Sequence, residues 1–342
     1  MTAPAETHAL ATYSAEIGAD PLLIQGAGGN TSIKLGDEMW IKASGTQLKD
    51  ALKEDIFVCV ESRGIAQAVR AGSEDADQPQ AFLKHGTLRP SIETCLHAIM
   101  PQKVVIHVHC VSTIAQAIRK DAEDIFCQKF AGFDWAFVSY VKPGAGLAAG
   151  VISASETPRS VYVLGNHGLL IGADDVESAR SLLTEVTDAA RLTPTLSPLE
   201  PTGLDHIETN HGVFERAAAR NPITSVAQST GHSTQVADSA LFPDQVLFCG
   251  PDIVVIDDES NIVAALNAGK ERYGKRPPVF LLRGRAAYIH TEASATEKEM
   301  IQCVGDVMVR VPSGAELSYL SKADCAALLN WDAEKYRHQM NS

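Results

Sequence analysis

Two histidines, His107 and His109, lie two residues apart at the end of a stretch rich in β-branched residues, Val104–Val108. Such residues favour a strand, and side chains along a strand alternate between its two faces. The two imidazoles therefore point to the same side. Because neutral imidazole nitrogen is a good zinc ligand, the pair predicts half of a divalent-metal site.

Two further groups can complete this site. His167 lies in a glycine-flanked turn between apolar stretches at 161–164 and 169–171, which predicts a rigidly held third ligand. Glu93 falls in the first turn of a helix that we expect to begin at Pro90 or Ser91, since apolar residues follow with helical spacing. An acidic residue there also complements the helix dipole, so both roles stay open for Glu93 alone.

Polar turns that suit an anion accompany these residues. The glycine cluster at 26–29 departs from a dinucleotide fingerprint, which needs glycine where the chain has Thr31, and a hairpin follows it. A glycine-rich turn beside Asn30 still offers backbone N–H groups to a phosphate or carboxylate, although a turn that requires positive φ explains the glycines equally well. Ser44–Gly45 forms a second such turn, and Ser91 marks the helix start.

The combination indicates a type of chemistry. Three protein nitrogens with an open coordination position are typical of a catalytic zinc site. A metal, a carboxylate that moves a proton and an anion cradle together suggest carbon–carbon chemistry on a sugar phosphate, in which the metal polarises a carbonyl and stabilises an enediolate.

The bulk properties limit the other classes of function. A chain of 342 residues predicts one large domain, 1–193, and a smaller one, 204–342, joined by a linker with three prolines. A net charge of −13 disfavours nucleic acid and anionic membranes as partners, and no apolar run is long enough to span a bilayer. The odd cysteine count without a CxxC motif and the lack of a secretory signal favour the cytoplasm.

The smaller domain reads as a separate α/β unit, and the sequence shows no internal repeat. Its expected strands are Gln245–Phe248, Asp252–Ile256, Pro278–Leu282 and Ala286–His290, and its expected helices are Asn261–Tyr273, Ala295–Met308 and Lys322–Met340.

The motifs resemble those of the class II aldolase/adducin family, in family order across about residues 8 to 192. The matching segments are Gly29–Ser32, Ser44–Gly45, Pro90–Glu93, His107–His109 and Asn166–Gly168. The resemblance implies an αβα sandwich around a mainly antiparallel sheet, with a smaller C-terminal α/β unit.

The resemblance also implies a role for each site residue. Zn²⁺ would bind His107, His109 and His167, and Glu93 would be the acid/base that also ligates zinc when substrate is absent. The substrate phosphate would contact Gly29, Asn30, Ser44, Gly45 and Ser91.

Two departures from the family pattern bear on the substrate. Many phosphate-binding members have two consecutive serines before the glutamate, whereas here the second is Ile92, which leaves phosphorylation of the substrate open. Some family aldolases protonate the leaving group with a tyrosine. Tyr140 is the candidate for that role here.

The C-terminal region is similar to the aldolase portion of bifunctional rhamnulose-1-phosphate aldolase/alcohol dehydrogenases. The likeness lies in Leu241–Val246, Glu271–Pro277 and Asn330–Arg337. The chain stops before a dehydrogenase portion, so we expect no nicotinamide chemistry.

These observations predict a zinc-dependent lyase that cleaves a ketose phosphate. The alternatives are a sugar-phosphate 4-epimerase or a 3-oxo-acid phosphate decarboxylase on the same zinc site, or a non-catalytic adducin-like scaffold. A scaffold has no need of the histidines and Glu93, so it is disfavoured. We expect a cytoplasmic homo-oligomer, a tetramer by family resemblance, with a small sugar or sugar phosphate as its partner.

Overall fold

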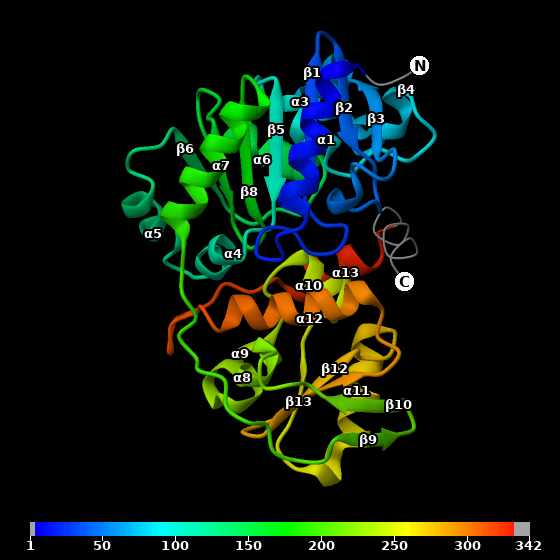
Figure 1. The fold of residues 1–342 in the computed structure, drawn as a ribbon, viewed down its shortest axis with the longest axis vertical. Helices are drawn as coiled ribbons and strands as arrows, with labels where there is room; N and C mark the ends of the chain where they lie inside the picture. The colour runs from blue at the N-terminus through cyan, green and yellow to red at the C-terminus, as the bar shows by residue number, and fades with distance from the viewer. Residues whose placement is uncertain (1–3, 332–342) are drawn as a thin grey trace. The chain divides into compact units, whose positions relative to one another are not determined.

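The computed structural model describes residues 4–331 (Figure 1). It divides into two compact units. Unit 1 comprises the chain up to residue 113 together with residues 122–191, and unit 2 comprises residues 114–121 together with the chain from residue 192 onwards.

An eight-stranded sheet forms the centre of unit 1, in the order β4-β3-β2-β1-β5-β8-β7-β6. Every neighbouring pair is antiparallel except β6 and β7, which are parallel. The strands are β1 (Asn30–Leu35), β2 (Glu38–Lys42), β3 (Phe57–Glu61), β4 (Leu83–His85), β5 (Val104–Val108), β6 (Trp135–Val138), β7 (Val161–Leu164) and β8 (Gly168–Ala173).

Helices cover both faces of this sheet, as Figure 1 shows. Helices α2, α3 and α6 share a hydrophobic core with one face, and α1 and α7 pack on the other. The predicted αβα sandwich around a mainly antiparallel sheet is confirmed. The helices are α1 (Ala5–Gly18), α2 (Ser62–Ala71), α3 (Thr94–Ile99), α5 (Ala122–Lys129), α6 (Ala145–Ser153) and α7 (Val176–Ala190), while α4 (Val111–Ala117) runs from unit 1 into unit 2.

Strand β5 lies in the middle of this sheet and directs the candidate ligands. Its residues are all buried, as expected for a continuous apolar run with neighbours on both edges. Val105 packs into the core shared with α3 and α6. Because strand side chains alternate, His107 and His109 face that same layer.

Unit 2 contains a five-stranded sheet, in the order β11-β12-β13-β10-β9. Only β11 and β12 are parallel. Helix α11 packs on one face, and α8 and α9 contact the other, where α12 packs on α8. The elements are β9 (His206–Thr209), β10 (Gly212–Arg216), α8 (Pro222–Gln228), α9 (Thr230–Asp238), α10 (Pro243–Phe248), β11 (Val254–Ile256), α11 (Ile262–Tyr273), β12 (Val279–Leu282), β13 (Ala286–His290), α12 (Ala295–Met308) and α13 (Lys322–Leu329).

Two expectations for unit 2 need correction. The predicted strand Gln245–Phe248 is part of helix α10, because Pro243 supplies a helical first residue and the Cys249 N–H donates to the Gln245 carbonyl. A short buried apolar run does not distinguish strand from helix. Of the predicted C-terminal helix Lys322–Met340, the structure forms Lys322–Leu329 with Asn330 as its C-cap, and the part expected past residue 331 lies outside the described residues.

No helix in residues 4–331 has both the length and the apolar character needed to cross a bilayer.

Candidate active site

Three histidines meet at the ends of neighbouring strands. His107 is on β5, His109 follows it, and His167 lies in the turn that joins β7 to β8. All three are buried, and their ligand atoms lie within 4.8 Å of one another. The turn is held in an unusual conformation, because Asn166 has φ 55°, the left-handed region that asparagine tolerates better than most residues.

Hydrogen bonding orients the first of these imidazoles. The His107 Nδ1 lies 2.8 Å from the Leu169 carbonyl oxygen, which can only accept, so Nδ1 carries the proton. The Nε2 lone pair of His107 therefore points at the cluster, where it lies 3.1 Å from the Nε2 of His109. A carbonyl that fixes the tautomer in this way is common behind metal-binding histidines.

Glu93 points its carboxylate into the histidine cluster. One oxygen, Oε1, lies 3.5 Å from His107 Nε2 and 3.4 Å from His167 Nε2. This atom is buried and has no hydrogen-bond partner, whereas Oε2 accepts a hydrogen bond of 2.8 Å from the amide of Asn30. Helix α3 begins at Thr94, so Glu93 is its N-cap residue and not part of the predicted first turn.

The surroundings of Glu93 keep it ionised. Burial by itself would raise the pKa of this carboxyl. Electrostatic attraction to the three histidines and the hydrogen bond from Asn30 outweigh burial and lower the pKa to about 2.

A buried hydrogen-bond chain leads from Glu93 to α3. Asn30 must turn its amide nitrogen to the carboxylate, so its oxygen accepts from His97 Nε2. His97 Nδ1 in turn accepts from the Ser32 hydroxyl at 2.8 Å. Burial, followed by the charges of His107 and Lys34, holds the pKa of His97 well below its usual range, which agrees with this neutral tautomer.

Two of the predicted anion-binding residues, Asn30 and Ser91, lie beside Glu93. The Ser91 hydroxyl lies 3.3 Å from the Asn30 amide nitrogen and accepts from the Glu93 N–H. The Ser44 N–H donates to the Arg89 carbonyl, two residues before Ser91, which brings the second polar turn to the segment that carries Ser91. Gly29 and Gly45 both have positive φ.

Gly29 is required by a close approach of two segments. A Cβ on this residue would lie 2.8 Å from the His107 carbonyl oxygen and 2.4 Å from the Ile24 side chain. The absence of a side chain at Gly29 therefore lets the first polar turn lie directly against β5.

Lys42 is a site residue that sequence reasoning missed. Its side chain is 2% exposed, and its ammonium donates to the carbonyls of Ala27 and Thr46, both at 2.8 Å. It thus links the two polar turns that are predicted to hold an anion. The available signal was a lysine ending an otherwise apolar strand, Met39–Lys42.

Tyr140 lies after β6, with its backbone nitrogen near Gly165 at the start of the turn that carries His167. Its role as a proton donor remains a prediction.

A divalent metal fits this donor set. Three imidazoles and one carboxylate oxygen without a hydrogen-bond partner converge on a buried point, which is costly unless something binds there. Nitrogen donors with one exchangeable carboxylate suit zinc better than the oxygen-rich sites that calcium and magnesium prefer.

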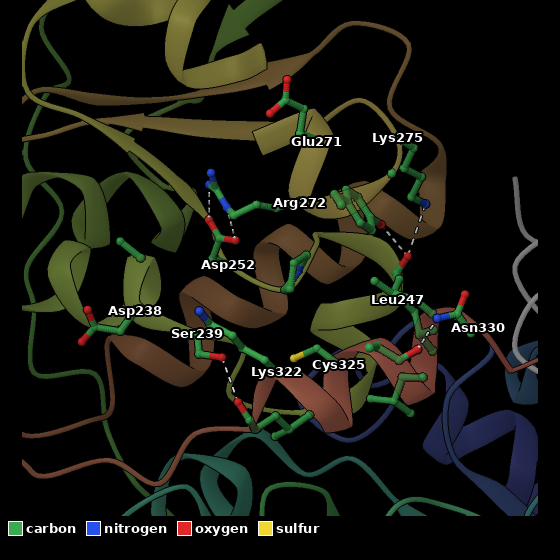
Figure 2. A pocket seen from close by; sticks show the side chains of 18 residues that line it. Asp238, Ser239, Leu247, Asp252, Glu271, Arg272, Lys275, Lys322, Cys325 and Asn330 are labelled. Carbon is green, nitrogen blue, oxygen red and sulfur yellow. Dashed lines mark hydrogen bonds and ion pairs between the residues drawn. The ribbon is translucent and has the colours of Figure 1, made fainter. Parts of the chain in front are cut away.

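A large hollow in unit 2 has a different character. It has a volume of about 1150 Å³ and is lined by residues of α9, α11 and α13 and their flanking loops (Figure 2). Arg272 in its wall forms two hydrogen bonds to Asp252, and the Tyr273 hydroxyl donates to the Leu247 carbonyl. None of the predicted catalytic or metal-binding residues lines it.

Relatives of known sequence or structure resemble about half of this chain. The chain is 29% identical over 182 residues to the "Uncharacterized oxidoreductase YuxG" of Bacillus subtilis, covering 47% of this chain and 26% of that protein. It thus spans about a quarter of that relative's length.

Solved structures are also similar to somewhat more than half of this chain. One is the N-terminal class II aldolase domain of a conserved Thermoplasma acidophilum protein, with a TM-score of 0.49, 24% identity and coverage of 56% of this chain and 94% of that chain. Another is the L-fuculose-1-phosphate aldolase of Thermus thermophilus, with a TM-score of 0.38, 16% identity and coverage of 54% and 89%. The likeness to bifunctional aldolase/dehydrogenase proteins stays a prediction.

The family model of the class II aldolase and adducin N-terminal domain matches residues 9–193, which is more than half of the chain and contains every predicted site residue. The chain therefore belongs to the class II aldolase/adducin family.

Proposed function

We propose that this protein is a zinc-dependent aldolase that cleaves a ketose phosphate into a dihydroxyacetone-like fragment and an aldehyde. The observation that carries the proposal is the convergence of three buried imidazoles with the Glu93 oxygen that lacks a hydrogen-bond partner. Family membership supports the same reading.

His107, His109 and His167 would hold the metal. When bound, zinc supplies Lewis-acid polarisation of the substrate carbonyl. The Leu169 carbonyl keeps the proton on His107 Nδ1, so this ligand presents its Nε2 lone pair without rearrangement.

Glu93 would transfer the proton at carbon. In the condensation direction, the Glu93 carboxylate removes a proton from the carbon of the dihydroxyacetone-like fragment, and the electron pair of that C–H bond forms the new bond to the aldehyde carbon. The aldehyde oxygen takes up a proton as its double bond opens, and we assign the donation to the Tyr140 hydroxyl. Cleavage is the reverse: the Tyr140 phenolate takes back the hydroxyl proton as the carbon–carbon bond breaks, and Glu93, which still holds the proton it removed, returns it to the carbon of the ketose fragment.

The low pKa of Glu93 means that the side chain at rest is an ionised carboxylate, which is the form that a general base requires. Asn30 holds Oε2, so Oε1 is the oxygen that faces the substrate.

The substrate anion would be held between the two polar turns. Ser91 and the turn at Ser44 lie together, and the Lys42 ammonium joins the turns from below. A buried cation close to backbone N–H groups favours a dianionic group such as a phosphate ester.

The decisive experiment is a substrate screen with the zinc-loaded protein. Ketose 1-phosphates, the matching unphosphorylated ketoses, pentulose phosphates and 3-oxo-acid phosphates are offered separately, and the products are identified by mass spectrometry. Release of a dihydroxyacetone-like fragment with an aldehyde supports the proposal. An epimer or CO₂ as the product, with no aldehyde, would assign the same site to a different reaction.

The metal content is measured on the same preparation. We expect about one zinc per chain, removable by chelation with loss of turnover and restored by zinc. A pure, active protein without metal would overturn the zinc assignment.

The setting of the enzyme is part of the proposal. All seven cysteines are free thiols, which supports a reducing compartment such as the cytoplasm. A homo-oligomer, expected as a tetramer, is tested by light scattering.

A further inference from the structure

The sheets of the two units share one arrangement of strands. Unit 1 has the order β6-β7-β8-β5 at one end of its sheet, with β6 parallel to β7 and the other pairs antiparallel. Unit 2 has β11-β12-β13-β10 with the same directions. The order of the elements along the chain also agrees. In unit 1 the order is β5, α4 and α5, β6, α6, the β7–β8 hairpin and α7. In unit 2 it is β10, α8 to α10, β11, α11, the β12–β13 hairpin and α12.

The strand pairing in the two hairpins has the same register: adding 118 to a residue number in the unit 1 hairpin gives the corresponding residue in unit 2. In unit 1, Val161 pairs with Ile171 and Leu164 pairs with Gly168. In unit 2, Val279 pairs with Ile289 and Leu282 pairs with Ala286. The parallel pairs agree as well, because Val138 opposite Leu164 corresponds to Ile256 opposite Leu282.

The turns of the two hairpins also correspond. Each has three residues, and the middle one has positive φ, 55° at Asn166 and 73° at Gly284. The N–H of the third turn residue donates to the last strand residue in both, His167 to Leu164 and Arg285 to Leu282.

This correspondence identifies the positions in unit 2 that match the metal ligands. His107 pairs with Leu170 and Arg216 pairs with Tyr288, the residue that corresponds to Leu170. Arg216 therefore stands where unit 1 has His107. Two residues on, Ala218 stands in the place of His109.

Arg285 stands in the place of His167, so none of the three equivalent positions carries a metal ligand. Unit 2 also lacks a counterpart of Glu93, because β9 and β10 are joined directly by a tight turn at Asn210–His211. In unit 1 the corresponding strands, β1 and β5, enclose the segment that contains α3.

The linker before β9 covers the equivalent position. The Arg216 guanidinium donates to the carbonyls of Pro201 at 3.2 Å and Gly203 at 2.8 Å, and it forms an ion pair with Asp205. The Tyr288 hydroxyl donates to the Leu204 carbonyl at 3.0 Å. Gly203 has φ 120°, and a Cβ there would lie 2.5 Å from that hydroxyl.

We infer that unit 2 is a second copy of the metal-binding half of unit 1, in which the metal position has been replaced by Arg216 and closed by the linker Pro201–Asp205. Residues 4–331 then contain one metal site, the one in unit 1, and the equivalent position in unit 2 is not a second catalytic centre. This inference rests on the proposed function for the identity of the site in unit 1.

The test rebuilds the ligand set in unit 2. The triple variant Arg216→His/Ala218→His/Arg285→His places histidines at the three equivalent positions. The matched control, Arg216→His/Ala217→His/Arg285→His, has the same composition but moves one histidine to the other face of the strand. Metal per chain is measured in both, with Co²⁺ absorption to report tetrahedral coordination.

We expect the equivalent triple variant to bind one metal ion more than the control. Equal metal content in the two variants, with far-ultraviolet circular dichroism like that of the wild type, would overturn the inference. We also expect the variant His109→Ala, made in the wild-type background, to bind no metal. One ion retained by that variant would show that a second site lies elsewhere in the chain. If the wild type binds no metal while the triple variant gains one, the proposed function fails and the correspondence of the units stands.

A second measurement does not depend on the folding of the triple variant. Arg216→Ala removes the guanidinium contacts to the linker, and we expect proteolytic cleavage between residues 201 and 205 to become roughly tenfold faster, since the lost hydrogen bonds are worth about 1–2 kcal/mol together. Arg220→Ala is the control, because Arg220 is exposed nearby and has no contact with these carbonyls among the hydrogen bonds described. Equal cleavage rates in the two variants would contradict the closing role of Arg216.

Discussion

Units 1 and 2 hold the same four strands in the same register, yet different residues lie at the end of the inner strand in each unit. At corresponding positions, unit 1 has His107 and His167, and unit 2 has Arg216 and Arg285. Unit 1 surrounds its histidines with a helix that carries Glu93, while unit 2 lays a linker over its arginines.

In both units the strands fix the positions of the side chains at their ends, and the units differ in the segments that connect the strands. The turn with a positive-φ residue is kept in both units, so it serves the hairpin and not the metal. What distinguishes unit 1 is the long segment between β1 and β5, which adds Glu93 at the start of α3 and the polar turn at Ser44–Gly45. The shared strand arrangement is therefore no evidence of activity by itself, and any inference about activity depends on the residues at the strand ends.

The largest expected effect comes from paired alanine variants at corresponding positions. His107→Ala removes a ligand, so we expect loss of the metal and a fall in kcat/KM of roughly 10³-fold or more, because Lewis-acid stabilisation is worth several kcal/mol. Arg216→Ala should leave both the metal content and kcat/KM unchanged. Elemental analysis and steady-state kinetics check the pair, and a loss of activity in both variants would break the comparison.

The next effect separates the metal from proton transfer. Glu93→Gln keeps the shape of the side chain and its contact with Asn30 but cannot accept a proton, so we expect kcat to fall on the order of 10²–10⁴-fold while zinc is retained. Because the pKa of Glu93 is about 2, its carboxylate stays ionised above pH 4. The acidic limb of the wild-type kcat/KM profile must then come from another group. A limb that vanishes in Glu93→Asp, with turnover otherwise normal, would contradict this.

The parts of the site that are local in sequence could be predicted, and the long-range contacts could not. Alternation along one strand predicts that His107 and His109 share a face, and flanking glycines indicate the fixed turn of His167. Their approach to Glu93 follows from how β5, β8 and α3 pack, to which only the family resemblance pointed. The Asn30–His97 contact joins residues 67 positions apart, and its signal was no more than a histidine on a helix.

The correspondence between the units escaped sequence reasoning for a related reason. Buried strands accept many apolar residues, so aligned positions such as Leu169 and Ala287 need not match while the backbone pairing is kept. The same permissiveness explains the error at Gln245–Phe248, where an apolar run suited a strand as well as the helix that forms.

A smaller effect is expected from the residue that holds Asn30. His97→Ala removes the donor to the Asn30 oxygen, so the amide is free to turn away from Glu93. We expect kcat to fall about tenfold, as for one buried hydrogen bond, with KM and zinc content nearly unchanged. His97→Gln retains an N–H donor and should recover part of the loss. A rise in KM or a loss of metal as large as the fall in kcat would indicate a structural role only.

The smallest effect addresses the residue at which unit 1 departs from the phosphate-binding pattern. Ile92→Ser restores a hydroxyl beside Ser91, at a side chain that is already partly exposed. If the substrate is phosphorylated, one added neutral hydrogen bond of about 0.5–1.5 kcal/mol should lower KM by roughly 2- to 10-fold for the ketose phosphate. The KM for the unphosphorylated ketose should not change. Ile92→Val provides the control, because it reduces the side chain without adding a donor. An equal change for both substrates, or the same change with valine, would show that the anion does not bind at this turn.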